Sequence, residues 1–593
     1  MTTSQVIQGI GASPGVAVGH AFVIDDRRVR TPKVRLSGAD VEAEVKRFDA
    51  AIAQSDAQLH ALKTRLEGEG GSGQEHGLIL EVHRIMVQDE MFAGGIRALI
   101  VQDGINAEWA VRRVARRIKH QFDNLEDEYF RERRADVDFV ADRVVRNLLG
   151  QTVDAEVELP PDAIVVAHEV SPSDAALLVK TGRVAAFVTD LGGQTSHTAI
   201  VARAREVPAV VGAARASQSI RQGDIVAVDG TRGVVLVAPT EAQLERLRES
   251  MREHLALEAT ALKTAELEAV TPDGYRMALN GNIEFPEEIP SLLAHGAEGI
   301  GLYRTEFLFL NRAEAPTEEE HYRCYRQVLE EMRGRPVTIR TLDLGGDKVP
   351  GKKPEREVNP ALGLRAIRYC LQHRELFRIQ LRALVRASAH GDLRVMFPLV
   401  SGLSELREAR TELEHCRSEL GRQGVPVGKR FPVGIMVETP SAAWIADRLA
   451  QEAEFFSVGT NDLIQYSLAI DRGNRDVAYL YRPMHLAVLR SLQNIVQAAK
   501  SARIPVAMCG EMAGDPFTTL VLVALGFDSL SMTAGQISPV KNIIRSISRS
   551  DAQEVLAGAM ECSTAEEIER FVATEFRRRY PQLSAPRTHA PKG

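Results

Sequence analysis

The spacing of apolar residues divides the chain into segments that favour helices and segments that favour strands. Two short β-rich runs flank the turn GASPG within residues 1–25. Between about residues 35 and 148, apolar residues recur every three or four positions, which is typical of amphipathic helices. Strand patterns then return as AIVVAHEV, AAFVTD, AVVG, DIVAVDG and GVVLVAP. This pattern predicts a discontinuous α/β domain, residues 1–28 and 149–239, interrupted by an all-helical domain, residues 29–148.

The second half of the chain has a repeated pattern. A charged stretch without glycine or proline, residues 240–268, predicts a long linker helix. Eight short apolar runs follow, and each ends in polar residues and precedes a helical segment: MALNGNI, GIGLYRT, VTIRTLD, LRVMFPL, VGIMVET, FFSVGTN, PVAMCGE and DSLSMTA. This is the order expected of a (β/α)8 barrel, which we place at residues 269–578, followed by a flexible tail, 579–593. The expected fold class is therefore multidomain α/β.

Unusual polar residues follow the barrel strands, at the end where such barrels carry their active sites. They are Arg304, Arg340, Asp343, Glu438, Asn461, Asp462, Cys509 and Glu511. With Arg365, Arg472 and Lys348, the arginines supply more positive charge than stability requires. Guanidinium groups match phosphate and carboxylate oxygens, so this set favours a small anionic substrate.

Glu438 and Asp462 are oxygen ligands of the kind that Mg2+ takes, usually together with substrate phosphate and water. The alternative is that both carboxylates only pair with the arginines. Cys509, between small residues at a strand end, is a candidate for proton transfer, although buried and inert cysteines are common.

His197 lies in TDLGGQTSHTAIVAR, where an apolar strand leads into a predicted helix. It has no companions at metal-ligand spacing and no GxSxG nucleophile motif. A neutral imidazole can accept a phosphoryl group, and the N–H groups of a helix start would stabilise the added charge. A histidine that merely lies near a helix cap is the alternative.

The overall composition limits the possible functions. A net charge of −7 without a basic stripe argues against nucleic-acid binding. Five cysteines without CxxC spacing fit a reducing cytoplasm rather than a disulfide framework or zinc site. No apolar run approaches membrane-spanning length. We therefore expect a cytoplasmic protein without membrane insertion.

Seven motifs in one order resemble enzyme I of the bacterial phosphoenolpyruvate-dependent phosphotransferase system over nearly the whole chain. They are GGQTSHTAIVARAREVPAVVG, GAEGIGLYRTEFLFLNR, IRTLDLGGDK, NPALGLRAIR, VGIMVETPSAA, FFSVGTNDLIQYSLAIDRGN and AMCGEMAGD. The resemblance implies that His197 accepts the phosphoryl group of phosphoenolpyruvate on Nε2 and that pyruvate is released.

The resemblance also assigns roles to the remaining site residues. It implies a substrate clamp of Arg304 and Arg340, with further contacts from Lys348, Arg365, Asn461 and Arg472. It makes Glu438 and Asp462 the Mg2+ ligands and Cys509 the group that protonates the enolate. Ser171, where relatives often have threonine, and Thr195 would surround the histidine.

The family's partners are implied in the same way. Its helical domain docks the phosphocarrier protein HPr, its barrel forms a homodimer, and its histidine domain swivels between the two partners. Here ILEVHRIMVQDEMF resembles the docking helix, with His83 and Asp89 in matching positions.

Two other functions stay open. A dikinase or synthase of the phosphoenolpyruvate-using class would share the barrel and histidine motifs, but it would also need an ATP-binding domain. The first 150 residues are too helical for one and lack a P-loop. A phosphoenolpyruvate-binding regulatory sensor would need no phosphoacceptor, so the set of histidine, arginines, carboxylates and cysteine disfavours it.

Overall fold

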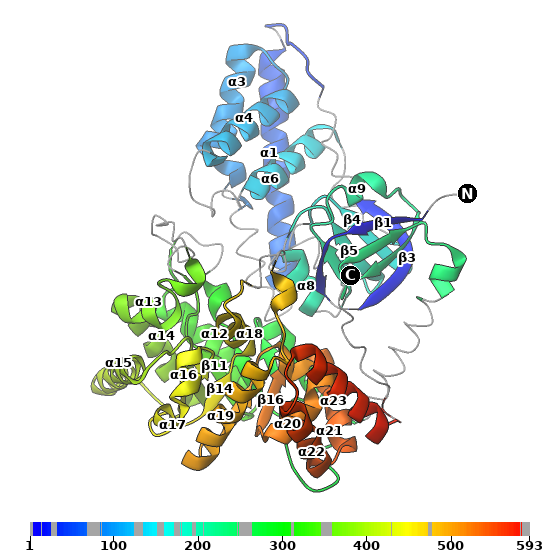
Figure 1. The fold of residues 1–593 in the computed structure, drawn as a ribbon. Helices are drawn as coiled ribbons and strands as arrows, with labels where there is room; N and C mark the ends of the chain where they lie inside the picture. Colours follow the sequence, from blue (N-terminus) through cyan, green and yellow to red (C-terminus); the bar gives the residue numbers. More distant parts are fainter. Residues whose placement is uncertain are drawn as a thin grey trace. The chain divides into compact units, whose positions relative to one another are not determined.

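The protein is described by a computed structural model (Figure 1). It describes residues 4–13, 15–24, 32–38, 40–67, 83–84, 86–123, 134–150, 159–170, 178–179, 181–192, 197–204, 207–245, 247, 264–309, 314–345, 359–428, 430–471, 477–581 and 583. The chain forms two compact units, residues 1–255 and 256–593, which are described separately below.

The helical part of the first unit contains the α-helices seen in blue and cyan in Figure 1. They are α1 (Val41–Glu67), α3 (Gly95–Asp103), α4 (Ala107–Asp123) and α6 (Arg134–Leu148), with the short π-helix η1 (Glu90–Gly94) before α3. Phe48, Ile96, Val111 and Val144 are fully buried in their shared core. The apolar spacing of three and four thus forms a helical bundle, as expected.

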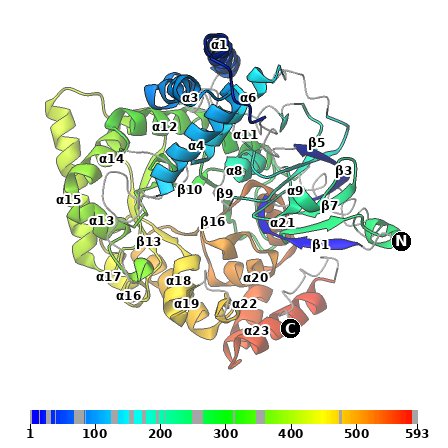
Figure 2. The same ribbon diagram turned by 90° about the horizontal axis from the view of Figure 1, so that it is seen from above.

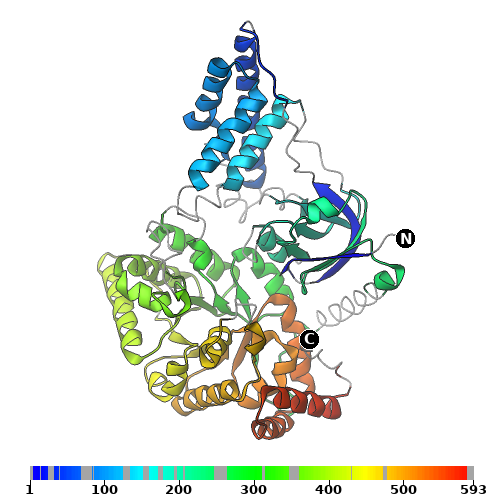
Figure 3. The ribbon, with the colours of Figure 1, turned by 45° about the horizontal axis from the view of Figure 1, so that its top comes forward.

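An eight-stranded sheet forms the α/β part of the first unit. Its strand order is β1-β8-β7-β3-β4-β5-β6-β2. The strands are β1 (Gln5–Gln8), β2 (Ile10–Ser13), β3 (Val16–Ile24), β4 (Ala163–Ala167), β5 (Val184–Thr189), β6 (Ala209–Val211), β7 (Ile225–Asp229) and β8 (Val234–Val237). The three N-terminal strands, blue in Figure 3, each pair with strands from beyond residue 160. The helical segment therefore interrupts one continuous sheet.

The second unit is a closed barrel of eight parallel strands. They are β9 (Ala278–Ile283), β10 (Ile300–Tyr303), β11 (Val337–Arg340), β12 (Leu393–Phe397), β13 (Val433–Val437), β14 (Phe456–Val458), β15 (Val506–Met508) and β16 (Ser529–Met532). Each lies within one of the eight predicted apolar runs, so the barrel prediction is confirmed. Figure 2 shows the helices of this unit arranged around its strands.

The barrel helices are amphipathic and cover the strands. The longer ones are α12 (Glu318–Glu331), α14 (Arg374–Ala387), α15 (Leu403–Arg422), α18 (Thr460–Leu468), α19 (Leu486–Ala502), α20 (Pro516–Leu525) and α21 (Ala534–Ser546), followed by α22 (Arg549–Met560) and α23 (Ala565–Arg579). Shorter helices are α11 (Ile289–Ala294), α13 (Ala366–Gln372), α16 (Pro440–Trp444) and α17 (Ala446–Leu449). A capping box at Thr317 begins α12, because its hydroxyl and the Glu320 carboxylate satisfy N–H groups of the first turn.

Ion pairs between outer helices also shape the barrel unit. The Glu412 side chain on α15 is 4% exposed and accepts from Arg374 at 2.6 Å and from Arg378 at 2.8 Å, both on α14. Burial alone would raise the pKa of Glu412, but the two arginines outweigh it and hold the pKa below its ordinary value. Most of the predicted linker helix, 240–268, lies outside the described residues.

Candidate active site

The carboxyl ends of the barrel strands hold most of the polar residues singled out in the sequence. Arg304 follows β10, Arg340 ends β11, and Glu438 follows β13. Asn461 and Asp462 lie in the first turn of α18, directly after β14, and Cys509 follows β15. Because the strands are parallel and closed into a ring, these side chains share one end of the barrel.

Arg340 is the most enclosed cation of this end, since the residue is 9% exposed. Its Nη2 donates to Glu306 at 2.8 Å, and its Nη1 lies 2.8 Å from Asp343 Oδ2. Burial would lower the pKa of Arg340, but the facing carboxylates outweigh it and raise the pKa. The buried Nε–H of Arg340 has no hydrogen-bond partner among the described residues. Among the described residues, this donor of the cationic group is therefore unsatisfied.

Arg365, immediately before α13, joins the same network. Its Nη2 donates to Asp343 Oδ1 at 2.7 Å and lies 3.4 Å from Asp462 Oδ2, and its Nη1 donates to Tyr466 at 3.3 Å. Asp343 therefore bridges Arg340 and Arg365. Burial would raise the pKa of Asp343, but these two guanidinium groups hold it below its ordinary value.

Arg304 occupies a more open position. Its side chain is 39% exposed, and its Nη1 donates to Glu284 at 2.6 Å. Together with Arg340 and Arg365 it provides three guanidinium groups at one end of the barrel. Such an arrangement suits the several oxygens of a phosphorylated carboxylate.

Glu438 and Asp462 are buried carboxylates, 2% and 8% exposed. Glu438 Oε1 accepts from the backbone N–H of Leu399 at 2.6 Å. Burial, followed by the nearby Asp343 and Asp462 carboxylates, raises the pKa of Glu438 well above its ordinary value. A glycine precedes α18 because space is short there: a Cβ on Gly459 would lie 2.7 Å from Glu438 Oε2.

The donor set fits Mg2+ rather than a metal that a protein encloses completely. No group of three or more His, Cys, Asp or Glu side chains that could hold a metal ion is found among the described residues. Mg2+ commonly takes one or two carboxylates and completes its shell with water and substrate phosphate. Glu438 and Asp462 provide hard oxygen donors of this kind.

Cys509 is 3% exposed and lies among charged groups of the site. Its Sγ accepts a hydrogen bond from the Ser457 hydroxyl at 3.2 Å. Burial raises the pKa of the Cys509 thiol, while the Ser457 hydrogen bond and Arg340 oppose that shift. Asn461 Nδ2 donates to Glu511 Oε1 at 2.9 Å, and this contact links the ends of β14 and β15.

His197 begins α8 (His197–Ala204) in the first unit. The next residue, Thr198, donates through its hydroxyl to the carbonyl of Val170 at 3.3 Å, which ties the first turn of α8 to the segment after β4. The side chain of His197 is outside the described part of the chain, as are Ser171, Thr195, Lys348 and Arg472.

The two residues expected to contact the carrier differ in accessibility. His83 is 5% exposed, so its ring belongs largely to the interior of the helical bundle. Asp89 is exposed and caps η1 by accepting from the backbone N–H of Met91 at 2.8 Å. Both residues come shortly before Met91 in the chain, and the side chain of Met91 is exposed.

Several site residues were not singled out as ligands or catalytic groups in the sequence. Glu306 and Tyr466 contact the arginine network, and Ser457 contacts Cys509. Glu306 could have been found as the carboxylate two positions after Arg304 at a strand end. Ser457 lies inside the apolar run FFSVG, and only the pairing of β14 with β15 reveals its contact with Cys509.

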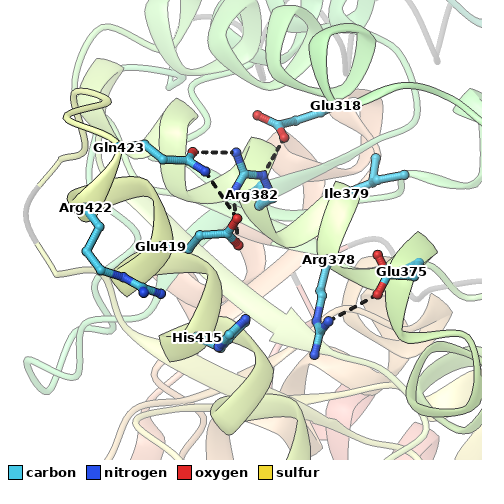
Figure 4. Close-up of a pocket in the computed structure, with 9 residues that line it drawn as sticks. All are labelled: Glu318, Glu375, Arg378, Ile379, Arg382, His415, Glu419, Arg422 and Gln423. Carbon is cyan, nitrogen blue, oxygen red and sulfur yellow. Dashed lines mark hydrogen bonds and ion pairs between the residues drawn. The ribbon is translucent and has the colours of Figure 1, made fainter.

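A separate hollow of about 610 Å3 lies on the outer helices α14 and α15 (Figure 4). Arg382 points between Glu318, Glu419 and Gln423 and is bonded to each, and Arg378 pairs with Glu375. Since these charges already neutralise one another on the outside of the barrel, this hollow is not the candidate active site.

Comparisons with known proteins agree with the geometry. Three family models match: the N-terminal domain of PEP-utilising enzymes at residues 8–133, their mobile domain at 159–233 and their PEP-binding domain at 258–549. A phosphoenolpyruvate-protein phosphotransferase from Bacillus sp. (strain S) is 41% identical over 96% of this chain and 98% of its own. The chain belongs to the phosphoenolpyruvate-protein phosphotransferase family. In this family, the enzyme I family, the Bacillus subtilis (strain 168) member is 40% identical over 97% of this chain and 100% of its own.

Solved structures include a further member of the enzyme I family. A solution structure of an enzyme I protein is 33% identical, covers 42% of this chain and 98% of its own, and has a TM-score of 0.35. Family membership favours a phosphotransferase over the dikinase and sensor alternatives. Among the described residues, no helix has both the length and the apolar character needed to cross a membrane.

Proposed function

We propose that the protein transfers the phosphoryl group of phosphoenolpyruvate to Nε2 of His197 and then to a histidine of an HPr-like carrier. The observation that carries the proposal is the buried Arg340, which has an unpartnered Nε–H among the described residues and lies with Arg365 beside paired carboxylates at the barrel mouth. This combination suits an anionic, phosphorylated substrate that binds together with a divalent cation.

In the first step, Arg340, Arg365 and Arg304 bind the phosphate and carboxylate oxygens and stabilise the charge that spreads over them during transfer. Lys348, Asn461 and Arg472 provide further contacts. The P–O bond to the enol oxygen breaks as the N–P bond to His197 forms, and the enolate keeps the electron pair. Glu438 and Asp462 would hold Mg2+, which neutralises phosphoryl oxygens when it is bound.

Cys509 then gives its S–H proton to C3 of the enolate, which produces pyruvate. Its buried position beside Arg340 and Glu438 supports this role, because the thiol retains its proton until the enolate forms. Ser171 and Thr195 flank the phosphohistidine in this proposal. The N-terminus of α8 would stabilise the added charge on the phosphorylated ring.

The carrier binds the helical domain, residues 29–148, in this proposal. Among the described residues, three large apolar side chains are exposed there: Val34 is 49% exposed, Met91 on η1 is 63% exposed and Val101 on α3 is 60% exposed. Asp89 adds a charge beside Met91, whereas the buried His83 would act mainly by shaping the surface. Binding of an HPr protein to the full chain, measured by calorimetry, should weaken in Met91→Ser and remain unchanged in the barrel variant Val427→Ser.

The remaining parts of the proposal concern organisation. The α/β domain, residues 1–28 and 149–239, swivels about the linker, 240–268, while the barrel, 269–578, dimerises. Most of the predicted tail, 579–593, lies outside the described residues. Exposed apolar side chains on the barrel unit support self-association, and Trp444 on α16 is 82% exposed. None of the five cysteines forms a disulfide in the described part of the chain, which fits the cytoplasm. Analytical ultracentrifugation of wild type and Trp444→Ser tests the dimer.

The central test is the intact mass of the purified protein after incubation with phosphoenolpyruvate and Mg2+, without nucleotide. We expect an acid-labile gain of one phosphoryl group that is absent in His197→Ala and in the presence of EDTA. Glu412→Gln serves as a control because Glu412 lies between outer helices of the barrel. Phosphoenolpyruvate binding without any mass gain would instead favour the sensor function.

A further inference from the structure

The described end of the predicted linker, residues 264–268, lies against one helix of the barrel unit. It is bonded to three side chains of α21: Lys541, Asn542 and Arg545. Both segments belong to the second unit. The chain is therefore fastened to the barrel at the point where the predicted linker ends.

Lys541 is the central contact, and it is buried. The residue is 1% exposed, and its Nζ donates to the Ala265 carbonyl at 2.5 Å and to the Gly296 carbonyl at 3.3 Å. Gly296 has a φ of +79°, and a Cβ there would lie 2.0 Å from the Ala265 carbonyl oxygen. The two backbone segments thus approach each other closely, and one ammonium group holds a carbonyl from each.

Two further contacts extend this anchor along the segment. The Thr264 hydroxyl donates to Asn542 Oδ1 at 3.1 Å, and Arg545 Nη1 donates to the Glu268 carbonyl at 2.7 Å. Lys541 and Arg545 are four positions apart, so they lie on the same face of α21. We call Lys541, Asn542 and Arg545 the linker clamp.

A lysine in this interior position needs an explanation, because its neighbours Val540 and Ile544 are apolar and fully buried. Burial lowers the pKa of Lys541, an effect that Glu298 opposes and Arg545 reinforces. A buried ammonium group costs free energy unless acceptors satisfy it. A methionine would fill similar space without this cost, so the contribution of the lysine lies in the two carbonyls that it binds.

The helix that carries the linker clamp begins at the substrate end of the barrel. Thr533, the N-cap residue of α21, directly follows the carboxyl end of β16. Gln536, in the first turn, lies against Gly514, where a Cβ would be 2.1 Å from its Oε1. Gly514 ends η8 (Glu511–Gly514), which begins two positions after Cys509. One continuous helix thus joins the end that carries the site residues to the linker clamp.

We propose that Lys541, at the centre of the linker clamp, is a positioning residue for phosphoryl transfer: it fixes the barrel end of the linker and so limits the region that His197 must search to reach the substrate. This inference rests on the proposed function. Release of residues 264–268 would lengthen the tether of the α/β domain. A longer tether lowers the effective concentration of His197 at the barrel mouth.

The test compares Lys541→Met with wild type in the full chain. Methionine keeps an unbranched side chain but cannot bind the carbonyls of Ala265 and Gly296. We expect the rate of His197 phosphorylation at saturating phosphoenolpyruvate and Mg2+, followed by intact mass in a single turnover, to fall about three- to tenfold. The phosphoenolpyruvate concentration that gives half of the maximal rate should change by less than about twofold, because the substrate residues are untouched.

Hydrogen exchange of the full chain reports on the linker clamp itself. The Leu267 N–H donates to the Thr264 carbonyl, and the Val270 N–H donates to the Glu268 carbonyl. Peptides covering residues 264–270 should exchange at least about tenfold faster in Lys541→Met, as expected for the loss of hydrogen bonds to a charged group. Unchanged exchange would show that Lys541 does not hold this segment and would overturn the inference.

Two variants separate anchoring from stability. Val540→Ala creates a cavity at a fully buried position of the same helix but removes none of the hydrogen bonds to residues 264–268, so the folded variant should keep the wild-type rate. Arg545→Gln changes an exposed member of the linker clamp, which protects the test against a misfolded Lys541→Met, and should lower the rate about twofold. Equal losses of rate in Val540→Ala and Lys541→Met would overturn the inference.

The proposed function and this inference fail in different ways. Absence of His197 phosphorylation in wild type would refute the proposed function and, with it, the role of the linker clamp in transfer. Faster exchange of residues 264–270 in Lys541→Met with a wild-type rate of phosphorylation would overturn the inference alone. A weakened affinity of Lys541→Met for phosphoenolpyruvate would place its effect in the substrate site and would also overturn the inference.

Discussion

Gln380 on α14 contacts the chain segments that carry the arginine network. Its replacement by leucine tests how strongly the barrel depends on these buried hydrogen bonds. The side chain is fully buried. Its Oε1 accepts from the Leu342 N–H at 3.0 Å, and its Nε2 donates to the Thr305 and Tyr325 hydroxyls at 3.1 and 3.0 Å. The Thr305 hydroxyl donates in turn to the Arg340 carbonyl at 3.0 Å. Gln380 thus connects a helix to the ends of β10 and β11.

Gln380→Leu keeps a similar volume but removes all three hydrogen bonds. Each bond contributes about 1 kcal/mol net, and a buried N–H without an acceptor costs about 1–3 kcal/mol. Leu342 is fully buried, so water cannot replace the lost acceptor. We therefore expect the substitution to destabilise the barrel by about 3–5 kcal/mol.

Hydrogen exchange of the full chain, followed by mass spectrometry, measures this effect where it arises. Peptides covering residues 337–345 should exchange roughly 100- to 4,000-fold faster in Gln380→Leu, since about 1.4 kcal/mol corresponds to a factor of ten. Peptides from α4 belong to the other unit and should not change. The affinity for phosphoenolpyruvate should fall as well, because Asp343 directly follows Leu342.

The matched control is Gln327→Leu on α12, where the amide donates to Glu331 within the same helix at 2.9 Å and is partly exposed. It should alter exchange of residues 337–345 by less than about threefold, the effect of a surface substitution. If Gln380→Leu produced no larger change than this control, the reasoning about the buried network would be refuted.

Three further predictions concern other parts of the barrel unit. In thermal unfolding, Gly296→Ala should lower the free energy of unfolding by at least about 2 kcal/mol more than Gly334→Ala. Both glycines have φ near +80°, but only at Gly296 would a Cβ lie 2.0 Å from a backbone oxygen. Equal losses of stability in the two variants would contradict this reasoning. Glu412→Gln should lower stability by about 1–3 kcal/mol at neutral pH. Since the folded-state pKa of Glu412 is lowered, its contribution to stability is complete above the ordinary pKa of 4.5 and is lost as the pH falls through the folded-state value. If urea titrations gave a stability difference between wild type and Glu412→Gln that did not depend on pH, the ion-pair role of Glu412 would be refuted. Gly459→Ala should displace Glu438 and raise the Mg2+ concentration that half-saturates His197 phosphorylation about tenfold or more, and an unchanged Mg2+ requirement would argue against that contact.

The fold class was predictable because it depends on local patterns. Each of the eight apolar runs of the second unit contains a barrel strand, since a buried parallel strand must be apolar over its whole length and must be followed by a helix that covers it. The helical part of the first unit followed from apolar spacing of three and four in the same way. These patterns repeat along the chain, so a single ambiguous segment does not change the outcome.

The candidate site was predictable only in part. Polar residues at strand ends, such as Arg340 and Glu438, stand out from apolar surroundings in the sequence. Their partners do not, because the spacing along the chain is unrelated to the distance across the barrel. Asp343 contacts Arg365, which lies 22 positions away, and Ser457 contacts Cys509, which lies 52 positions away.

The sequence by itself determined the order of helices and strands, the end of the barrel that carries the polar residues, and the family to which the chain belongs. These properties follow from hydrophobic periodicity and from short motifs, which are local. Only the tertiary structure decided that Arg340 is buried with a free Nε–H among the described residues, that Asp343 bridges two arginines, and that Ser457 reaches the sulfur of Cys509. Closing the barrel brings distant strand ends together, and burial there makes each hydrogen bond and charge count for more than it would in water.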